Sequence, residues 1–114
     1  MPATIFESVD HLRAHLDSEF FDMYVYVTSG GFDPIHVGHL RCIQETAKLA
    51  ENWDRIGVVV VIVNGDGFLQ RKKGFAFMPH EERMEIIAGI GGVDFVVPWD
   101  DGTQFVTGAL EKLK

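Results

Sequence analysis

The fold of this chain is decided by Tyr24–Thr28 (YVYVT) and the stretch that follows it, Ser29–His39 (SGGFDPIHVGH). The first five residues are β-branched or aromatic and predict a strand. Gly30 and Gly31 then allow the chain to turn sharply. Over Gly38–Ala50, apolar residues recur on one stripe, which predicts a helix. Such a strand–turn–helix unit presents free backbone N–H groups and the positive end of a helix dipole, and both attract phosphate.

The segments on either side of this unit predict an α/β domain with a Rossmann-like, three-layer parallel sheet. Gly57–Val63 (GVVVVIV) is uniformly apolar, as strands buried on both faces of a parallel sheet are. The other expected elements are an amphipathic helix over Ser8–Leu16, a loop over Asn64–Met78, a helix that begins at Pro79 and ends at Gly91-Gly92, a strand over Asp94–Val97 and a final helix over Thr103–Leu113. The order α-βαβαβ-α is typical of right-handed crossovers between parallel strands.

The 114 residues suffice for one domain with one core, and we divide them into a leading helix (residues 1–22) and a βα core (residues 23–114). Three predicted strands leave an exposed edge on each side of the sheet. Doubly wound sheets normally have more strands. We therefore expect that the C-terminal part of the domain is missing or that the sheet pairs with a neighbour, and a homodimer is one such pairing.

Composition excludes several classes of protein. The net charge is −7, from 10 Lys and Arg against 17 Asp and Glu, whereas nucleic-acid-binding proteins usually have a basic face. The apolar stretches are too short to span a membrane, and the first ten residues show no secretory signal. The one cysteine, Cys42, cannot form an internal disulfide, which favours a reducing compartment. We expect a cytoplasmic protein that binds no nucleic acid and no membrane, although the basic run Arg71-Lys72-Lys73 suits a small anionic ligand.

Two histidines are the strongest candidates for chemistry. His36 and His39 lie three residues apart across the predicted helix start, so both imidazoles can face one phosphate group. Gly38 between them removes a side chain where a ligand could approach the backbone. Helix capping and zinc binding are the alternatives. A zinc site needs further Cys or His ligands, and only Cys42 is close in sequence, where we expect a small core residue instead.

Gly31–His39 (GFDPIHVGH) contains the HxGH signature, and in its strand–turn–helix context the chain resembles the cytidylyltransferase-like nucleotidyltransferases. The resemblance covers about residues 24–101 and includes Val63–Asp66, Lys73-Gly74, Glu82-Arg83 and Val93–Pro98. The leading helix also resembles the one that precedes this domain in ADP-heptose synthases.

The resemblance implies transfer of a nucleotidyl group from CTP to a phosphorylated small alcohol or sugar, with release of pyrophosphate and no covalent enzyme intermediate. A substrate phosphate oxygen would attack the α-phosphorus in line, so catalysis would consist of positioning and charge neutralisation. The implied catalytic residues are His36, His39 and Lys73. The implied nucleotide-binding residues are Gly31, Phe32, Asp33, Gly38, Lys72 and Arg83. Mg²⁺ is expected to bridge the phosphates largely through water, and no residue is assigned as a metal ligand.

The resemblance leaves alternatives for the substrate. Trp99–Thr103 is acidic where glycerol-phosphate cytidylyltransferases tend to place a lysine. This departure resembles the heptose-phosphate adenylyltransferases and makes ATP, with a sugar phosphate such as heptose 1-phosphate, the second candidate. Family members also carry a Ser/Thr-rich segment that binds the triphosphate, and nothing similar follows Pro98. A non-catalytic nucleotide-binding module is therefore the third candidate.

Several of the implied residues have a structural alternative. The basic run could lie on a solvated loop, Asp33 could only fix the turn, and Arg83 could form an ion pair within the helix layer. The remaining large aromatic residues are predicted to cover the core or a sheet edge, and one of the last two is a candidate to shield the nucleotide base: Trp53, Phe68, Phe75 and Phe77. His80 is expected at the surface, without an assigned role.

Overall fold

The computed structural model describes residues 2–20, 22–51, 57–103 and 106–113. Its elements, in chain order, are β1 (Thr4–Ile5), α1 (Val9–Glu19), β2 (Tyr24–Gly30), α2 (Val37–Ala50), β3 (Gly57–Asn64), α3 (Asp66–Lys73), α4 (His80–Ala88), β4 (Phe95–Trp99) and α5 (Thr107–Leu113). The α/β class and the predicted alternation of strands and helices are confirmed. Two of these elements, β1 and α3, were not predicted from the sequence.

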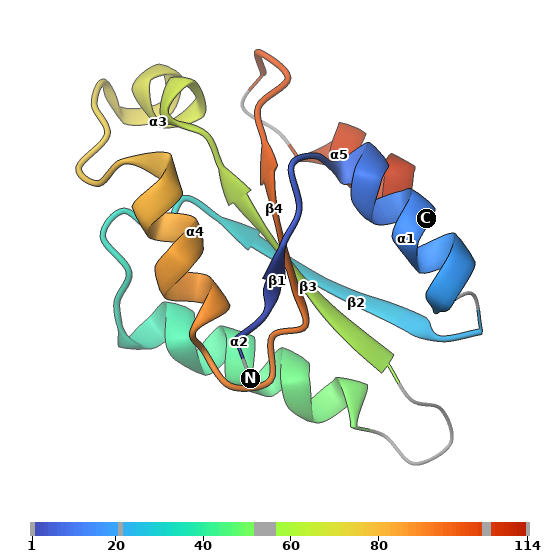
Figure 1. Ribbon diagram of the computed structural model, residues 1–114. Coiled ribbons are helices and arrows are strands. Elements are labelled where there is room, and N and C mark those ends of the chain that lie inside the picture. Colours follow the sequence, from blue (N-terminus) through green and yellow to red (C-terminus); the bar gives the residue numbers. More distant parts are fainter. Residues whose placement is uncertain (1, 21, 52–56, 104–105, 114) are drawn as a thin grey trace.

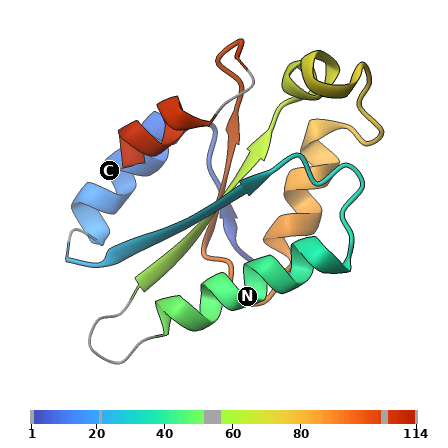
Figure 2. The same ribbon diagram turned by 180° about the vertical axis from the view of Figure 1, so that it is seen from behind.

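The four strands form one parallel sheet in the order β1-β4-β3-β2 (Figure 1). Helices α1 and α5 cover one face of the sheet, and α2 and α4 cover the other, as the two opposite views show (Figures 1 and 2). The predicted three-layer architecture is therefore confirmed. Because all strands run in the same direction, their carboxyl ends lie at the same end of the sheet, which we call its carboxyl edge. Helix α3 lies there, directly after β3.

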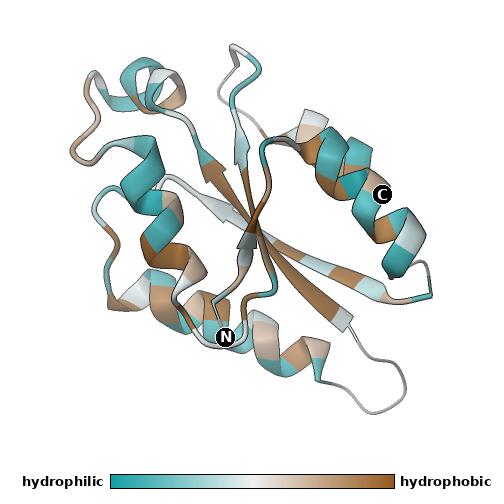
Figure 3. Cartoon of the chain, in the orientation of Figure 1, coloured by the Kyte–Doolittle hydropathy of each residue, from teal (hydrophilic) through white to brown (hydrophobic). Residues whose placement is uncertain are grey.

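Alternating side chains of β3 build the two cores. Val58, Val60 and Ile62 pack with buried residues of α1 and α5, whereas the intervening valines pack with buried residues of α2 and α4. Burial of one such side chain contributes about 1.5–3 kcal/mol of stability. β3 gains this contribution on both of its faces because it lies in the centre of the sheet. Figure 3 shows the same distribution, with apolar residues along the strands and polar residues on outer helix surfaces. No helix of the described segments is both long and apolar enough to cross a membrane.

One edge of the sheet is formed by a strand that was not predicted from the sequence. β1 pairs with β4 through Thr4 and Phe95 and through Ile5 and Val96, so the strand at this edge is the exposed β1 and not β4, which was the last strand predicted on this side. Two residues are too few for a side-chain pattern to be recognised. The leading segment is thus a strand followed by α1, not a helix alone. On the other side, β2 is the last strand of the sheet in the described part of the chain.

The predicted loop over Asn64–Met78 is wrong, because its first half is helix α3. Only Phe68 and Leu69 of this helix are buried, so the segment lacks the apolar stripe by which a helix is usually recognised. The basic run Arg71-Lys72-Lys73 forms the last turn, where cations interact favourably with the helix dipole. Gly74 ends the helix in the left-handed conformation, with φ of 87°.

Other predicted boundaries differ from the structure by a few residues. β2 extends through Gly30, α4 ends at Ala88 rather than at Gly91-Gly92, and α5 begins at Thr107 rather than at Thr103. Pro79 is the residue before α4 rather than its first residue. Residues 104 and 105, within the predicted final helix, lie outside the described residues.

Burial corrects three further predictions. Cys42 is exposed on α2 rather than part of the core. Phe68 is buried as predicted, but Phe75 and Phe77 are 51% and 69% exposed and cover neither core nor sheet edge. They lie between α3 and α4, beside the carboxyl ends of the strands. Trp53 is outside the described residues.

Candidate active site

A cavity of about 400 Å³ lies between α3 and the turn that follows β2. Its lining comes from two segments that are far apart in the sequence: Gly31, Phe32, Asp33, Pro34, His36 and His39 from the turn and the start of α2, and Phe68, Leu69, Lys72 and Lys73 from α3. β2 and β3 are parallel neighbours, so their carboxyl ends bring the two segments together. Every predicted site residue lines this cavity except Gly38 and Arg83.

His36 and His39 form a stacked pair at the start of α2. Their ring centroids are 3.8 Å apart, with an angle of 26° between the ring planes. Nδ1 of His36 accepts the N–H of Gly38 at 3.0 Å, and Nδ1 of His39 accepts the N–H of His36 at 3.1 Å. The histidines therefore do cap the helix, as one alternative proposed. Because each Nδ1 accepts, the proton of each neutral ring is on Nε2, where it can be donated to a ligand.

The environment keeps His39 neutral. Burial lowers the pKa of His39, and the neighbouring His36 lowers it further because two positive charges would repel. At neutral pH the His39 ring is therefore a hydrogen-bond donor rather than a cation. A neutral N–H donor can stabilise negative charge on a phosphate oxygen through a hydrogen bond.

Gly38 provides the space in which the His36 ring lies. A Cβ atom on Gly38 would be 2.8 Å from Cε1 and 3.1 Å from Nδ1 of His36. The first distance is shorter than real carbon contacts, so any side chain would displace the ring. The space that was predicted for an approaching ligand is occupied by the ring of His36.

The turn itself is shaped around Phe32 and Gly31. Phe32 has a φ of 52°, a left-handed conformation that costs a non-glycine residue about 1–2 kcal/mol. Its buried ring packs edge-to-face on His39, with centroids 5.1 Å apart. A Cβ on Gly31 would lie 2.6 Å from Cδ2 of Leu69, so this glycine allows α3 to contact the turn directly. The Phe32 ring thus packs against His39 and supports the histidine pair, and it does not face solvent.

Asp33 connects the turn to the segment between α3 and α4. Its buried carboxylate accepts the N–H groups of Phe77 at 2.5 Å and Met78 at 2.6 Å, and it forms an ion pair of 3.1 Å with Lys73. Burial by itself would raise the pKa of Asp33, but the Phe77 amide, Lys73 and the Met78 amide outweigh it and lower the pKa. The side chain therefore fixes local structure, as its alternative role predicted, and reaches more than forty residues along the chain to do so.

Lysines of α3 form the wall of the cavity that the turn faces. The Lys73 ammonium donates to the backbone oxygen of Asp33 at 2.6 Å and lies 4.8 Å from the centroid of the Phe75 ring. Lys72, one residue earlier in the same helical turn, also lines the cavity. The cavity thus combines two cations with two neutral Nε2–H donors, which is a chemical environment suited to a polyphosphate.

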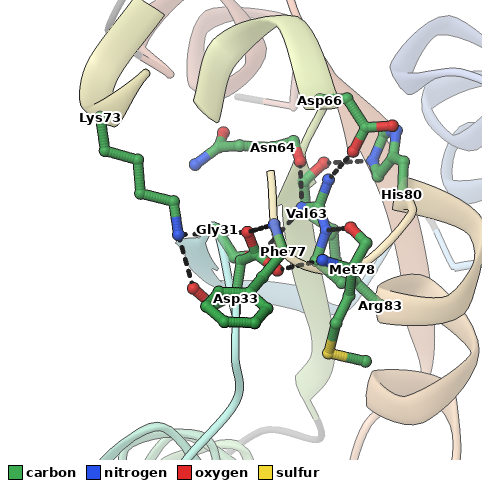
Figure 4. Close-up of polar contacts among 10 residues, drawn as sticks. All are labelled: Gly31, Asp33, Val63, Asn64, Asp66, Lys73, Phe77, Met78, His80 and Arg83. Carbon is green, nitrogen blue, oxygen red and sulfur yellow. Dashed lines mark hydrogen bonds and ion pairs between the residues drawn. The ribbon is translucent and has the colours of Figure 1, made fainter. Parts of the chain in front are cut away.

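Arg83 does not line the cavity; its guanidinium points to backbone oxygens and to Asp66 (Figure 4). Its side chain is only 1% exposed. Nε donates to Met78 O at 2.9 Å, Nη1 donates to Gly31 O at 2.8 Å and Asn64 O at 2.5 Å, and Nη2 donates to Asp66 Oδ1 at 2.6 Å. The predicted contact of Arg83 with nucleotide is therefore corrected. Its guanidinium joins the ends of β2 and β3 to the start of α4, because a buried guanidinium needs acceptors for its N–H groups and finds four there.

His80 and Asp66 are neighbours of Arg83 to which the sequence assigned no role. His80 Nε2 donates to Val63 O at 2.9 Å (Figure 4). Burial lowers the pKa of His80, and the hydrogen bond to Val63 opposes this shift only in part. One signal could have identified Asp66: it follows β3 by two residues, at the sheet edge where ligands of α/β proteins bind. No comparable signal marks His80.

A second cavity of about 360 Å³ lies on the other side of the start of α3. It is lined by Glu7, Ser8, Val9, Asp10, Gly65, Asp66, His80, Pro98, Trp99 and Asp100. Four carboxylates make this cavity unsuitable for a polyphosphate. Within the described ranges, no group of three or more His, Cys, Asp or Glu side chains is arranged to hold a metal ion.

The parallel sheet with helices on both faces and a glycine turn after its edge strand defines an α/β domain of the Rossmann-like class. The particular family follows from its sequence. Residues 27–111 match the model of the cytidylyltransferase-like family, and the chain belongs to this family. The resemblance inferred from the HxGH stretch is thereby confirmed.

Relatives are consistent with this family, and a solved structure is consistent with the fold. The chain is 38% identical over 81 residues to the bifunctional protein HldE of Photobacterium profundum, covering 69% of this chain and 16% of that protein. It is 33% identical over 103 residues to the bifunctional protein HldE of Vibrio atlanticus, covering 89% of this chain and 19% of that protein. The chain thus spans less than a fifth of these relatives. The fold is similar to that of the lipopolysaccharide core biosynthesis protein from Thermoplasma volcanium, with a TM-score of 0.63 and 22% identity over 78% of this chain and 67% of that one.

Proposed function

We propose that this domain transfers a nucleotidyl group from a nucleoside triphosphate to a phosphorylated small alcohol or sugar and releases pyrophosphate. The observation that carries the proposal is the orientation of the two histidines. Each accepts a backbone N–H at Nδ1 and so has its proton on Nε2, beside a cavity with two lysines. Four donors around one cavity match the oxygen atoms of a triphosphate better than they match an uncharged ligand.

The chemistry requires positioning rather than a covalent intermediate. An oxygen of the acceptor's phosphate attacks the α-phosphorus, and the bond between that phosphorus and the bridging oxygen breaks in line with the attack. The electron pair of the broken bond leaves with pyrophosphate. His36 and His39 donate hydrogen bonds to the phosphate oxygens as negative charge develops on them, and Lys72 and Lys73 neutralise that charge. Phe32, Asp33 and Gly38 hold these donors in place.

Magnesium is proposed to enter with the nucleotide, as a complex with its phosphates. Mg²⁺ keeps much of its water shell and binds substrate phosphates readily, which does not require a cluster of protein carboxylates. Asp33, the carboxylate that lines the cavity, already accepts hydrogen bonds from two amides and pairs with Lys73. Its role is therefore assigned to positioning, and no metal ligand is assigned to this chain.

CTP is the proposed nucleotide, in agreement with the family to which the chain belongs. ATP with a sugar phosphate is the second candidate, because the end of β4 is acidic. Asp100 at that position forms an ion pair with Arg71, so β4 supplies no cation comparable to the lysine of glycerol-phosphate cytidylyltransferases. Phe75 and Phe77 pack edge-to-face 5.8 Å apart beside Lys73, and either ring is a candidate to contact the nucleotide base.

A pyrophosphate-release assay tests the proposal. The chain is incubated with Mg²⁺, CTP or ATP, and a panel of phosphorylated alcohols and sugars, while nucleotide binding is measured separately by calorimetry. Release of pyrophosphate that depends on both nucleotide and acceptor supports transfer. Binding of nucleotide without release under all conditions would support a non-catalytic module instead, and absence of binding would contradict both.

A further inference from the structure

The carboxylate of Asp100, which follows β4, lies against the first turn of α3. Its Oδ1 accepts hydrogen bonds from Nη2 of Arg71 and from the N–H of Gly102, the latter at 3.1 Å. The N–H of Phe68 in α3 lies near enough to this carboxylate to favour its charged form. Partial burial by itself would raise the pKa of Asp100, but the donors at Gly102, Arg71 and Phe68 outweigh it and lower the pKa. The carboxylate is therefore ionised where the positive end of the α3 dipole favours an anion.

Two glycines make room for this contact. A Cβ on Gly67 would lie 2.6 Å from Oδ2 of Asp100, and a Cβ on Gly65 would lie 3.3 Å from the same oxygen. A side chain at position 67 would therefore displace the carboxylate. The sequence around the start of α3 is thus complementary in shape to one particular residue of the loop after β4.

The opposite end of α3 is bound by a second carboxylate. Lys73 donates to the backbone oxygen of Asp33 and pairs with its side chain. Helix α3 consequently bridges the loop after β4 and the turn after β2, across the carboxyl edge of the sheet (Figure 1). Asp66 adds a contact at the start of the helix through Arg83, at 2.6 Å.

These polar contacts determine where α3 lies because the helix has little else to hold it. It has eight residues, of which only Phe68 and Leu69 are buried. Isolated helices of this length are unstable in water, so tertiary contacts must supply the stability. Lys72 and Lys73 stand in the last turn of the same helix, and any movement of its first turn changes their position relative to His36 and His39.

We propose that Asp100 is a positioning residue for polyphosphate binding: through Arg71 and the first turn of α3, it holds Lys72 and Lys73 at the distance from the histidines that a bound triphosphate requires. The inference rests on the proposed function for its substrate, a triphosphate. The claim that Asp100 holds α3 in place does not depend on that function. Asp100 lines the second cavity rather than the histidine–lysine cavity, so it acts through α3 and not through contact with the phosphates.

The first experiment measures binding and turnover in Asp100→Ala. We expect the dissociation constants of Mg–CTP, Mg–ATP and inorganic tripolyphosphate to rise about tenfold, since a charge-assisted hydrogen bond is lost at the helix start. KM for the nucleotide should rise by a similar factor, and kcat should fall as well, because the displaced Lys72 and Lys73 neutralise charge that develops during the reaction. Asp101→Ala is the matched control, because the Asp101 carboxylate bonds to Thr103 within its own turn. Asp100→Asn, which preserves shape, replaces the alanine variant if that variant does not fold.

A double-mutant cycle tests whether Asp100 acts through the lysines. In a Lys72→Ala/Lys73→Ala background, Asp100→Ala should cause no further loss of tripolyphosphate affinity, because coupled residues are not additive. A further tenfold loss in that background would overturn the inference, as would unchanged affinity in Asp100→Ala with the lysines present.

Hydrogen exchange separates this inference from the proposed function. In the nucleotide-free chain, the amides of α3 should exchange several-fold faster in Asp100→Ala than in the wild type or in Asp101→Ala, because local opening becomes easier. Absence of pyrophosphate release in the wild type would contradict the proposed transfer reaction but leave this result and the tripolyphosphate affinities interpretable. Unchanged exchange in α3 would show that Asp100 does not hold the helix.

Discussion

The imidazole rings of His36 and His39 are stacked 3.8 Å apart, and each accepts at Nδ1 a backbone N–H from the start of α2 or the residue before it. Capping the helix and binding phosphate are therefore compatible roles. The helix uses one nitrogen of each ring, and the other nitrogen remains a donor. This relationship explains why histidine, with two ring nitrogens, suits both positions better than serine or aspartate, the usual capping residues.

Replacement of His39 tests the catalytic assignment. We expect His39→Ala to lower kcat by a factor of about 10²–10³, since a donor aimed at developing charge is lost. The capping bond to the N–H of His36 is also lost, at a cost of about 1 kcal/mol of stability. His39→Asn can still accept that N–H, so it should preserve stability better while remaining slow. Turnover close to that of the wild type in either variant would contradict the assignment.

Gly38→Ala separates activity from stability. Alanine favours a helix over glycine by about 1 kcal/mol, yet its Cβ would lie 2.8 Å from the His36 ring. We therefore expect turnover to fall by a factor of ten or more, while the free energy of unfolding changes by less than about 1 kcal/mol. Gly91→Ala is the control, because a Cβ there meets nothing within 4 Å. Loss of stability without loss of turnover would refute the role given to Gly38.

Arg83→Met tests the structural role of the buried guanidinium. The substitution keeps much of the side-chain volume but leaves Gly31 O, Asn64 O, Met78 O and the Asp66 carboxylate without this donor. Loss of a hydrogen bond to a buried acceptor costs about 1–3 kcal/mol, so the free energy of unfolding should fall measurably in urea unfolding. Arg41→Met, at an exposed position on α2, should change stability by less than about 0.5 kcal/mol. A near-normal unfolding free energy in Arg83→Met, with loss of nucleotide binding only, would restore Arg83 as a ligand.

Stability should fall as the pH falls below about 6.5, and His80 should account for part of the change. Burial lowers the pKa of His80 below its ordinary value of 6.5. The unfolded chain therefore binds a proton at a higher pH than the folded chain, and protonation favours unfolding. The contribution is complete above pH 6.5, declines below it, and levels off beneath the pKa of the folded state.

His80→Gln provides the test of that prediction. Glutamine keeps an N–H that can be donated to Val63 O but carries no titrating charge. Urea unfolding between pH 7.5 and pH 5 should show a smaller decrease of the unfolding free energy in this variant than in the wild type. His11→Gln, at an exposed position of α1, serves as the control. Equal decreases in all three proteins would exclude His80 as the origin.

The sequence by itself determined the architecture and the centre of the site. The uniformly apolar run of β3 indicated a strand buried on both faces, and the stretch from Gly31 to His39 placed two histidines at a helix start. Both predictions depend on local pattern, in which neighbouring residues impose the backbone conformation and the direction of the side chains. For the same reason the short pairing of β1 was missed, since two residues carry no pattern.

Only the tertiary structure decided which charged residues face the cavity and which support it. Arg83 and Lys73 look equivalent in sequence, but Arg83 is fully buried and bonded to four protein acceptors, whereas Lys73 lines the cavity. Likewise, the glycines at 65 and 67 have a structural role only because Asp100, more than thirty residues later, lies against them. Such contacts join segments that the sheet brings together, and burial and hydrogen-bond geometry between distant segments are not encoded in the spacing of residues along the chain.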